Sequence, residues 1–198
     1  MRFLPNRARH LALLFFCFTG LVCQAAEEHG EYTVKAVFLL NFTRFIEWPQ
    51  PAPSGPLVIG VLGDDPFGRK LDVALQGEKV GARPVVAKRL ESLAEIAECD
   101  ALFISQSEKD RLSRILARCQ QRPMLTVSDI SNFAEQGGMV EMVTQDTKIR
   151  LRINVEAARD ARLTISSKLL RPAQIVSTRK TSRHLHQSFR QRLVSLLR

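Results

Sequence analysis

Histidine is scarce in this chain of 198 residues, with only four, all near the two ends. Because histidine is the commonest acid–base catalyst near neutral pH and a frequent zinc ligand, a histidine-dependent enzyme has no candidate in the central region. The Gly-x-Ser-x-Gly, His-Glu-x-x-His and Gly-x-x-x-x-Gly-Lys motifs are also missing. His184 and His186 could hold a metal weakly, but a solvated tail is the simpler interpretation. We therefore expect no catalytic residues, no metal and no cofactor.

A hydrophobic run long enough to cross a membrane is lacking too. The longest apolar stretch, Leu11 to Val22, follows Arg2, Arg7 and Arg9, and it is shorter than the roughly 20 residues that a span needs. Small residues around Ala25 then match a cleavage site. We expect residues 1–25 to be a signal peptide cleaved near Ala25, which predicts export to the periplasm. A retained membrane anchor is the alternative.

Only four cysteines are present, and Cys17 and Cys23 fall within the expected signal peptide. An even pair in an exported chain is usually bridged, so we expect a disulfide between Cys99 and Cys119. Closing a loop of about 20 residues would stabilise the fold by about 3 kcal/mol on the chain-entropy estimate. Two free buried thiols are the alternative, and two cysteines alone fall short of a zinc site.

The net charge of +9 arises from basic residues at the two ends of the chain. Three basic residues lie in residues 1–25 and six in residues 179–198, which leaves 20 basic against 20 acidic residues in residues 26–178. A basic domain surface, as nucleic-acid binding needs, is therefore not implied. We expect no nucleic-acid partner, and a domain over residues 26–178 with a basic tail over residues 179–198.

The order of the predicted elements indicates an α/β fold. Residues 32–48 form an apolar helix, and a proline-rich linker over residues 49–56 follows. Buried strands are then expected at 57–62, 84–90, 101–104 and 124–127, with helices at 66–76, 93–97, 108–118 and 130–135 between and after them. This alternation predicts a layered domain with a mainly parallel central sheet flanked by helices.

The pattern changes after Gly137 and Gly138. Residues 139–144 and 148–154 flank a polar turn, and the second arm alternates apolar and polar side chains, so we expect an antiparallel hairpin at the edge of the sheet. A helix over residues 155–162 and a final segment over residues 165–176 follow. Cys99 precedes one parallel strand and Cys119 precedes the next, which places both sulfurs at the same end of the sheet.

One turn lies where a ligand could bind. Residues 60–68 join a predicted strand to a helix, where α/β folds often bind ligands, but the spacing of their glycines does not match a dinucleotide site. Asp64 or Asp65 is expected to cap the helix that contains Pro66 in its first turn. Contact between this turn and a ligand or partner is the alternative. Asp129 is expected to cap the helix at 130–135 in the same way.

The predicted domain opens with the motif Tyr32-x-Val-Lys-Ala-x-Phe-Leu-x-Asn-Phe-x-Arg-Phe-x-Glu-Trp-Pro49, and shorter motifs follow in order at 63–68, 137–139, 152–154 and 165–170. Together these motifs resemble those of the YfiR family of exported bacterial proteins. The similarity covers roughly residues 32–176. It implies a non-enzymatic periplasmic protein that represses an inner-membrane diguanylate cyclase by contacting its periplasmic sensor domain, thereby lowering cyclic di-GMP and biofilm formation.

The resemblance also implies a homodimer and a dependence on disulfide state. Family members with two bridges carry a second cysteine pair near the hairpin, where this chain has Met142 and Arg150. Redox switching would therefore have to act through Cys99 and Cys119. A periplasmic small-ligand sensor that signals to a histidine kinase is the first alternative function, and an enzyme of unrecognised type is the second.

Candidate contact residues follow from surface composition. The final segment mixes charged and apolar side chains, as partner surfaces do, and the tail from Arg183 has apolar residues at helical spacing opposite Arg190 and Arg192. Such a basic amphipathic tail can lie on an anionic membrane, dock in a partner's groove or cap the domain. The residues expected to bind the partner or a ligand are Arg44, Asp65, Phe67, Arg162, Ser167, Lys168 and Leu169.

Overall fold

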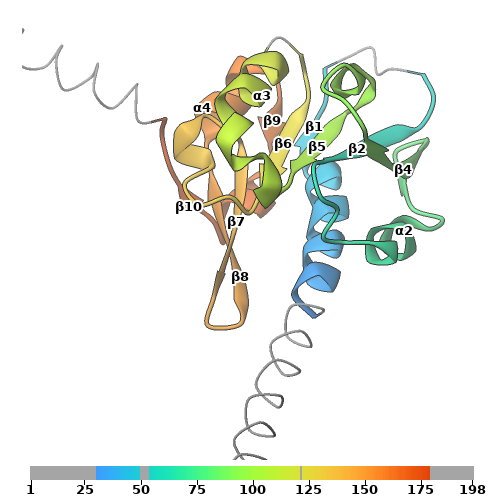
Figure 1. The fold of residues 1–198 in the computed structure, drawn as a ribbon, viewed down its shortest axis with the longest axis horizontal. Helices are drawn as coiled ribbons and strands as arrows, with labels where there is room; N and C mark the ends of the chain where they lie inside the picture. The colour runs from blue at the N-terminus through green and yellow to red at the C-terminus, as the bar shows by residue number, and fades with distance from the viewer. Residues whose placement is uncertain (1–29, 50–53, 121, 179–198) are drawn as a thin grey trace, which may run out of the picture.

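The fold was analysed in a computed structural model, which describes residues 30–49, 54–120 and 122–178. The expected signal peptide and the basic tail lie outside the described residues. Within the described ranges, no helix combines the length and apolarity needed to cross a bilayer. Figure 1 shows a central sheet with helices packed around it.

The sheet has eight strands in the order β10-β8-β7-β6-β5-β2-β4-β3. Its centre consists of four parallel strands: β4 (Arg83–Leu90), β2 (Leu57–Leu62), β5 (Ala101–Ile104) and β6 (Leu125–Ser128). The side chains of β2, β5 and β6 are largely buried, as expected for strands covered on both faces, whereas β4 buries only Val85 and Leu90. The predicted fold class is therefore confirmed. One short strand that was not predicted, β3 (Lys79–Val80), pairs antiparallel with the start of β4.

The predicted hairpin is also confirmed. Strands β7 (Val140–Gln145) and β8 (Lys148–Ile153) pair antiparallel, and the turn between them holds Asp146 and Thr147 at φ angles of 48° and 60°. Two positive φ angles in a two-residue turn match the right-handed twist of the flanking strands. The two-residue strand β10 (Gln174–Ile175) pairs parallel with β8, so it forms the edge beyond the hairpin.

Two clusters of buried apolar side chains lie on the two faces of the sheet. One face is covered by the N-terminal helix (residues 30–44), α2 (Arg69–Leu75), α4 (Val155–Asp160) and α5 (Ser167–Leu170). The other is covered by α3 (Leu112–Cys119) and the 3₁₀ turns η1 (Glu95–Glu98), η2 (Gln106–Arg111) and η3 (Ala134–Gln136). The chain is thus a three-layer α/β domain.

The N-terminal helix ends at residue 44, four residues earlier than predicted. Residues Ile46–Glu47 instead form the strand β1, which pairs antiparallel with β9 (Thr164–Ile165). Ile46 and Ile165 face each other and are 5% and 7% exposed. Burial of this pair and the proline at position 49, which disfavours helix in the preceding residue, explain why the chain leaves the helix.

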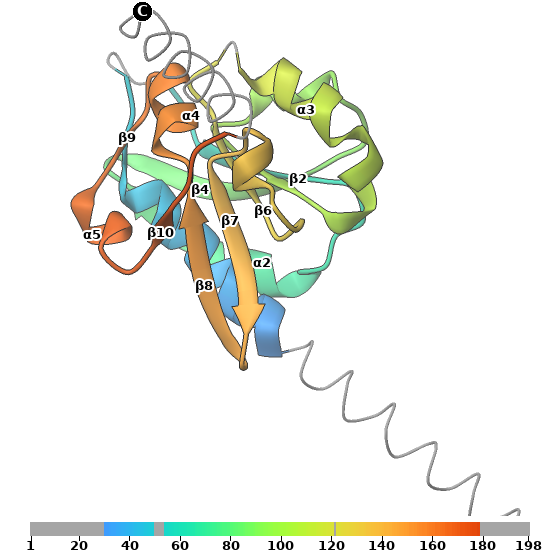
Figure 2. The same cartoon turned by 90° about the vertical axis from the view of Figure 1, so that its left-hand side faces the viewer.

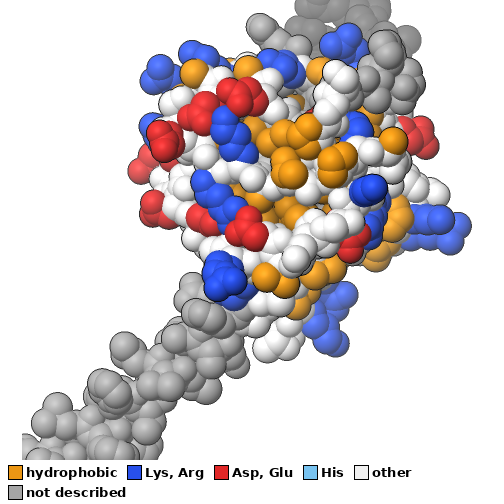
Figure 3. Space-filling view, turned by 90° about the vertical axis from the view of Figure 1, so that its right-hand side faces the viewer, with side chains coloured by type: hydrophobic (Ala, Val, Ile, Leu, Met, Phe, Trp, Pro, Cys, Tyr) orange, Lys and Arg blue, Asp and Glu red, His pale blue; other side chains and the backbone are white. Residues whose placement is uncertain are grey.

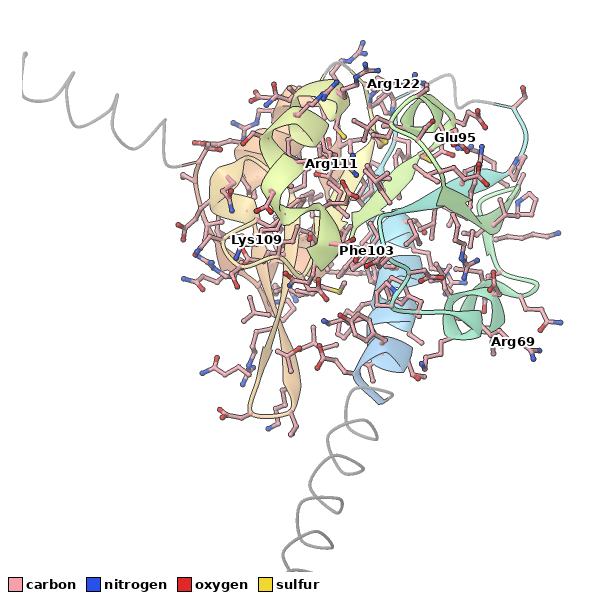
Figure 4. The ribbon with its side chains drawn as sticks, in the orientation of Figure 1. Arg69, Glu95, Phe103, Lys109, Arg111 and Arg122 are labelled. Carbon is pink, nitrogen blue, oxygen red and sulfur yellow. The ribbon has the colours of Figure 1, made fainter. Side chains whose placement is uncertain are left out.

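The apolar face of this helix packs on the sheet. Ala36, Leu39, Leu40 and Phe42 are at most 4% exposed and belong to the same buried cluster as Phe103 of β5. Phe103 lies beside the helix at the centre of the molecule (Figure 4). The apolar opening segment is therefore covered by protein, as the polar breaks in its sequence indicate.

Two expected helix caps are wrong. Helix α2 begins at Arg69 after Gly68, without a side-chain cap, because Asp65 Oδ1 accepts a hydrogen bond from Phe67 N at 2.8 Å and forms a turn before the helix. Asp129 does not cap the next segment either, since Ser128 Oγ accepts from Ile130 N at 3.0 Å. The helix expected at 130–135 is reduced to the turn η3.

Candidate functional site

The turn after β2 is held by its own ion pairs. Arg89 Nε donates to Asp65 Oδ2 at 2.9 Å, and its NH1 donates to Asp72 Oδ1 at 2.6 Å. The hydrogen bond from Arg89 lowers the pKa of Asp72 and outweighs the opposing effect of burial. Because Asp65 uses one oxygen in the turn and the other on Arg89, its carboxylate has a structural role in this domain.

At the ends of β2 and β5, where such folds often bind ligands, two loops of the chain approach each other closely. Gly63 has φ +88°, and a Cβ there would lie 2.5 Å from Ser107 Oγ, so the loops after β2 and β5 are in close contact. Phe67 is fully buried, with its ring 5.5 Å from Tyr32 and 4.7 Å from Phe103, centroid to centroid. The expectation that Phe67 contacts a ligand or partner is corrected, because its ring belongs to the core.

A buried ionic cluster at this end of the sheet was not predicted. Lys35 is 3% exposed, and its Nζ lies 2.6 Å from Asp129 Oδ2 and 2.5 Å from Glu31 Oε1. Tyr32 Oη also donates to Asp129 Oδ2 at 2.9 Å. Burial acts to raise the pKa of Glu31, but hydrogen bonds from Lys35 and Thr144 outweigh it and lower that pKa. The only sign of this cluster in the sequence is the four-residue spacing of Glu31 and Lys35, which makes the two side chains neighbours on a helix.

The pairing of β1 with β9 brings together residues far apart in the sequence. Ser166 N donates to Phe45 O at 2.9 Å, next to the pair Ile46–Ile165. This register places Arg44, the last residue of the N-terminal helix, beside Ser167, the first residue of α5. Two of the residues expected to bind the partner are therefore neighbours in the fold.

Exposure separates the remaining candidates. Ser167 and Lys168 are exposed on α5, and Arg44 is 39% exposed with an ion pair to Glu78. Leu169 is only 5% exposed and packs in the core, which corrects the expectation that it contacts a partner. Arg162 is exposed with a φ of 61°, but it lies beyond the other end of β9.

Exposed apolar side chains on the N-terminal helix extend this area. Val34 and Val37 are 48% and 45% exposed and follow one line along the helix toward Arg44. Neither valine was among the residues expected to bind a partner, although helical spacing places both away from the buried face that holds Leu39 and Phe42. We name this area the helix–α5 surface and define it as Val34, Val37, Arg44, Ser167 and Lys168.

A second exposed apolar area lies on the α2–β4 side of the domain, which Figure 3 shows face-on. Val73 of α2 and Val86 of β4 are 66% and 39% exposed there. They border an open hollow of about 630 Å³ whose lining includes Arg69 and Lys79. Glu78, the ion-pair partner of Arg44, also lines this hollow, so the two areas with exposed valines adjoin at that pair.

Both cysteines of the domain are buried and present as free thiols in the structure. Cys99 directly precedes β5 and Cys119 ends α3, as the topology predicted. Burial raises the pKa of Cys99 to about 11 and that of Cys119 to about 12, and the proximity of Cys99 adds to the second shift. Formation of a bridge between them stays a prediction.

The described ranges contain no group of three or more side chains that could hold a metal ion, and all four histidines fall outside them. A sequence model of the YfiR/HmsC-like family matches residues 32–174. The chain belongs to this family. YfiR/HmsC-like proteins are periplasmic, non-enzymatic regulators associated with membrane diguanylate cyclases. The family resemblance found in the sequence is thus confirmed.

No curated protein matches this YfiR/HmsC-like chain. Solved structures with a similar fold include the ABC domain from Streptococcus pneumonia in complex with L-Trp (TM-score 0.46, 14% identity). The matched region is 61% of this chain and 55% of the Streptococcus pneumonia chain. A conserved domain protein from Vibrio cholerae has a TM-score of 0.46 and 12% identity, covering 60% of this chain and 54% of its own length.

A third similar structure is the ligand-free, open form of a substrate binding protein with adhesive properties from Clostridium difficile. It has a TM-score of 0.42 and 11% identity, and it covers 62% of this chain. This YfiR/HmsC-like chain spans little more than half the length of each of these solved structures, 55% in the third case.

Proposed function

We propose that this protein binds the periplasmic sensor domain of an inner-membrane diguanylate cyclase and represses the enzyme, which lowers cyclic di-GMP and biofilm formation. The observation that carries the proposal is the family match over residues 32–174. The lack of a recognised catalytic motif, and of histidine in the central region of the sequence, supports a binding role over catalysis.

The helix–α5 surface is the contact area that we propose for the sensor domain. It combines two exposed valines with the basic side chains of Arg44 and Lys168, and partner surfaces commonly join an apolar centre to a polar rim. It is built on a helix and on α5, which the β1–β9 pair ties together. A complementary sensor surface would present apolar side chains flanked by carboxylates.

Both partners of the pair Arg44–Glu78 are 39% exposed, so a carboxylate of the sensor domain could compete for Arg44. Exposed ion pairs are worth little, in general about 0–1 kcal/mol, and exchanging one carboxylate for another therefore costs little. Arg44 can thus turn from Glu78 to a partner without destabilising the domain.

We also propose that the protein forms a homodimer, as family membership suggests. From the sequence of an exported chain we further propose cleavage near Ala25 and a disulfide between Cys99 and Cys119. The alternative of a small-ligand sensor would need a site within the domain. The turn expected for it is closed by Phe67 and by the pairing of Asp65 with Arg89.

Deleting the gene and measuring cellular cyclic di-GMP tests the proposal. A repressor predicts a rise in cyclic di-GMP that is reversed by the full-length chain supplied from a plasmid. The rise should also require an intact cyclase, so a strain that lacks the cyclase as well should show none. Unchanged cyclic di-GMP in the deletion strain would refute repression.

A further inference from the structure

A groove of about 550 Å³ lies between α3 and α4, next to the start of β6. Figure 2 shows the two helices on either side of this part of the sheet. The floor consists of apolar side chains that are 3% to 4% exposed: Leu116, Met139 and Ala161. Ala117 and Ala157, which are short, form parts of its walls and leave room for another element to approach closely.

The groove is acidic. Glu135 and Asp160 line it, and none of the described residues that line it is lysine or arginine. By contrast, the lining of the hollow beside α2 carries both signs of charge, with Arg69 and Lys79 alongside Asp72 and Glu78. Glu135 pairs with Arg152, whereas Asp160 is exposed at the end of α4. An occupant of this groove should therefore be apolar on one side and basic on the other.

The end of the described chain is fixed at this groove. Thr178 lines it, and Asn154 Nδ2 donates to Thr178 Oγ1 at 2.9 Å. Asn154 is fully buried, and its Oδ1 also accepts from Ala157 N at 3.0 Å at the start of α4. Residues 179–198 therefore begin at the groove itself.

The sequence of these 20 residues has the required chemistry. It contains six basic residues and no acidic one. Leu185, Phe189 and Leu193 follow at a spacing of four, and Leu196 and Leu197 continue the same face at helical spacing. The tail thus offers an apolar stripe with flanking positive charge, which complements an apolar groove bordered by carboxylates.

We propose that residues 179–198 dock in cis as an amphipathic helix in the groove between α3 and α4. The six residues from 179 to 184 can span up to about 20 Å when extended, so Leu185 can reach any part of a groove that begins at Thr178. Tethering raises the effective concentration of such a segment to the millimolar range, so a weak contact is enough to keep it bound.

When the tail docks in cis, its basic side chains contact acidic side chains of the same protein. Leu185, Phe189 and Leu193 cover the apolar floor, while Arg179 and Arg183 lie near Asp160. The apolar stripe is then unavailable to a membrane surface unless the tail leaves the groove. The inference is independent of the proposed repression, because it concerns contacts within one chain.

Hydrogen exchange of the full mature chain tests this inference. Amides of residues 185–197 should be protected by about tenfold or more relative to an unstructured peptide. Filling the groove with Ala117→Trp, or reversing its charge with Asp160→Arg, should remove that protection while the strands keep theirs. Both positions are exposed, so the domain should fold in either variant. Val73→Trp, at an exposed position on α2, is the matched control and should leave the tail protected.

Any of four results would overturn the inference. Tail amides that exchange at the unstructured rate would contradict docking, and so would protection that survives both groove variants. Protection that disappears on dilution would indicate docking between two copies. Protection that appears only with vesicles containing phosphatidylglycerol, and that is insensitive to Ala117→Trp, would assign the tail to a membrane surface.

Discussion

Lys35 Nζ lies 2.6 Å from Asp129 Oδ2, and the two side chains are 3% and 5% exposed although they are 94 residues apart in the sequence. The pair joins the N-terminal helix to the loop that follows β6, across the end of the sheet. Lys35 also lies 4.4 Å from the centre of the Tyr32 ring. A buried pair of this kind fixes how the first helix sits on the sheet.

Replacing Lys35 by methionine should destabilise the domain by about 3–5 kcal/mol, because the charge of Asp129 would stay buried without its cation. Urea denaturation followed by circular dichroism measures this change. Lys79→Met, at an exposed position on β3, is the matched control and should change stability by at most about 0.5 kcal/mol. Equal effects of the two variants would contradict the importance of the pair.

Gly63 and Gly68 provide a second test, because both have positive φ but only Gly63 is crowded. Gly68→Ala should lower the free energy of unfolding by about 1–3 kcal/mol, because a φ of 52° with a ψ of −135° is a backbone conformation that essentially only glycine adopts. Gly63→Ala should lower the free energy of unfolding by about 1–3 kcal/mol more than Gly68→Ala does, because the new methyl group would overlap Ser107 and Glu108. The free energy of unfolding of the two variants checks this order, and an equal loss would mean that the loops after β2 and β5 can separate easily.

The sequence predicted the parallel core well because the two central strands β2 and β5 are continuous runs of apolar residues bounded by turns. Ala101–Ile104 is such a run and was predicted with its observed bounds. The hairpin followed from the alternation in its second arm and the polar turn at Asp146. These are local signals, and a single stretch of sequence contains them.

The contacts that shape the candidate site are not local. The end of the first helix depends on Ile46 meeting Ile165, and the role of Asp129 depends on Lys35. Phe67 looks like a turn residue in the sequence, yet it packs between Tyr32 and Phe103. Pairings over such sequence distances have no signature in one chain, so Leu169 was wrongly expected to contact a partner. The exposure of Val34 and Val37 had a local signal, their helical spacing, which was not used.

The thiols give a prediction about pH. Burial raises the pKa of Cys99 to about 11 and that of Cys119 to about 12 in the folded state, whereas an unfolded thiol ionises near 8.5. Above that pH the unfolded state binds fewer protons, so the free energy of unfolding of the reduced protein should fall as pH rises from about 8.5 toward 11–12. Below that window the contribution of the thiols is fully present.

Urea denaturation of the reduced protein at several pH values, compared with the Cys99→Ala/Cys119→Ala variant, isolates the contribution of the thiols from that of other groups. The wild type should lose more stability than the variant between pH 8.5 and 11 or so. Parallel pH dependences would contradict the burial of the thiols.

Oxidation provides a separate prediction for the same pair. Protein purified from the periplasm without reductant should be 2 Da or so lighter than the reduced chain if Cys99 and Cys119 are bridged, and it should resist alkylation after unfolding. Reduction should then lower the free energy of unfolding by about 3 kcal/mol on the chain-entropy estimate. Two alkylated thiols in the oxidised, unfolded sample would show that the pair stays free.

The most direct test of the proposed function is the affinity of the mature chain for the purified periplasmic domain of the cyclase. Val37→Asp combined with Lys168→Glu should weaken binding by about tenfold or more, since both side chains are exposed on the helix–α5 surface. Val73→Asp, at an exposed valine on α2, should leave binding unchanged. Absence of binding by the wild-type chain, or loss of binding in Val73→Asp but not in the double variant, would contradict this account.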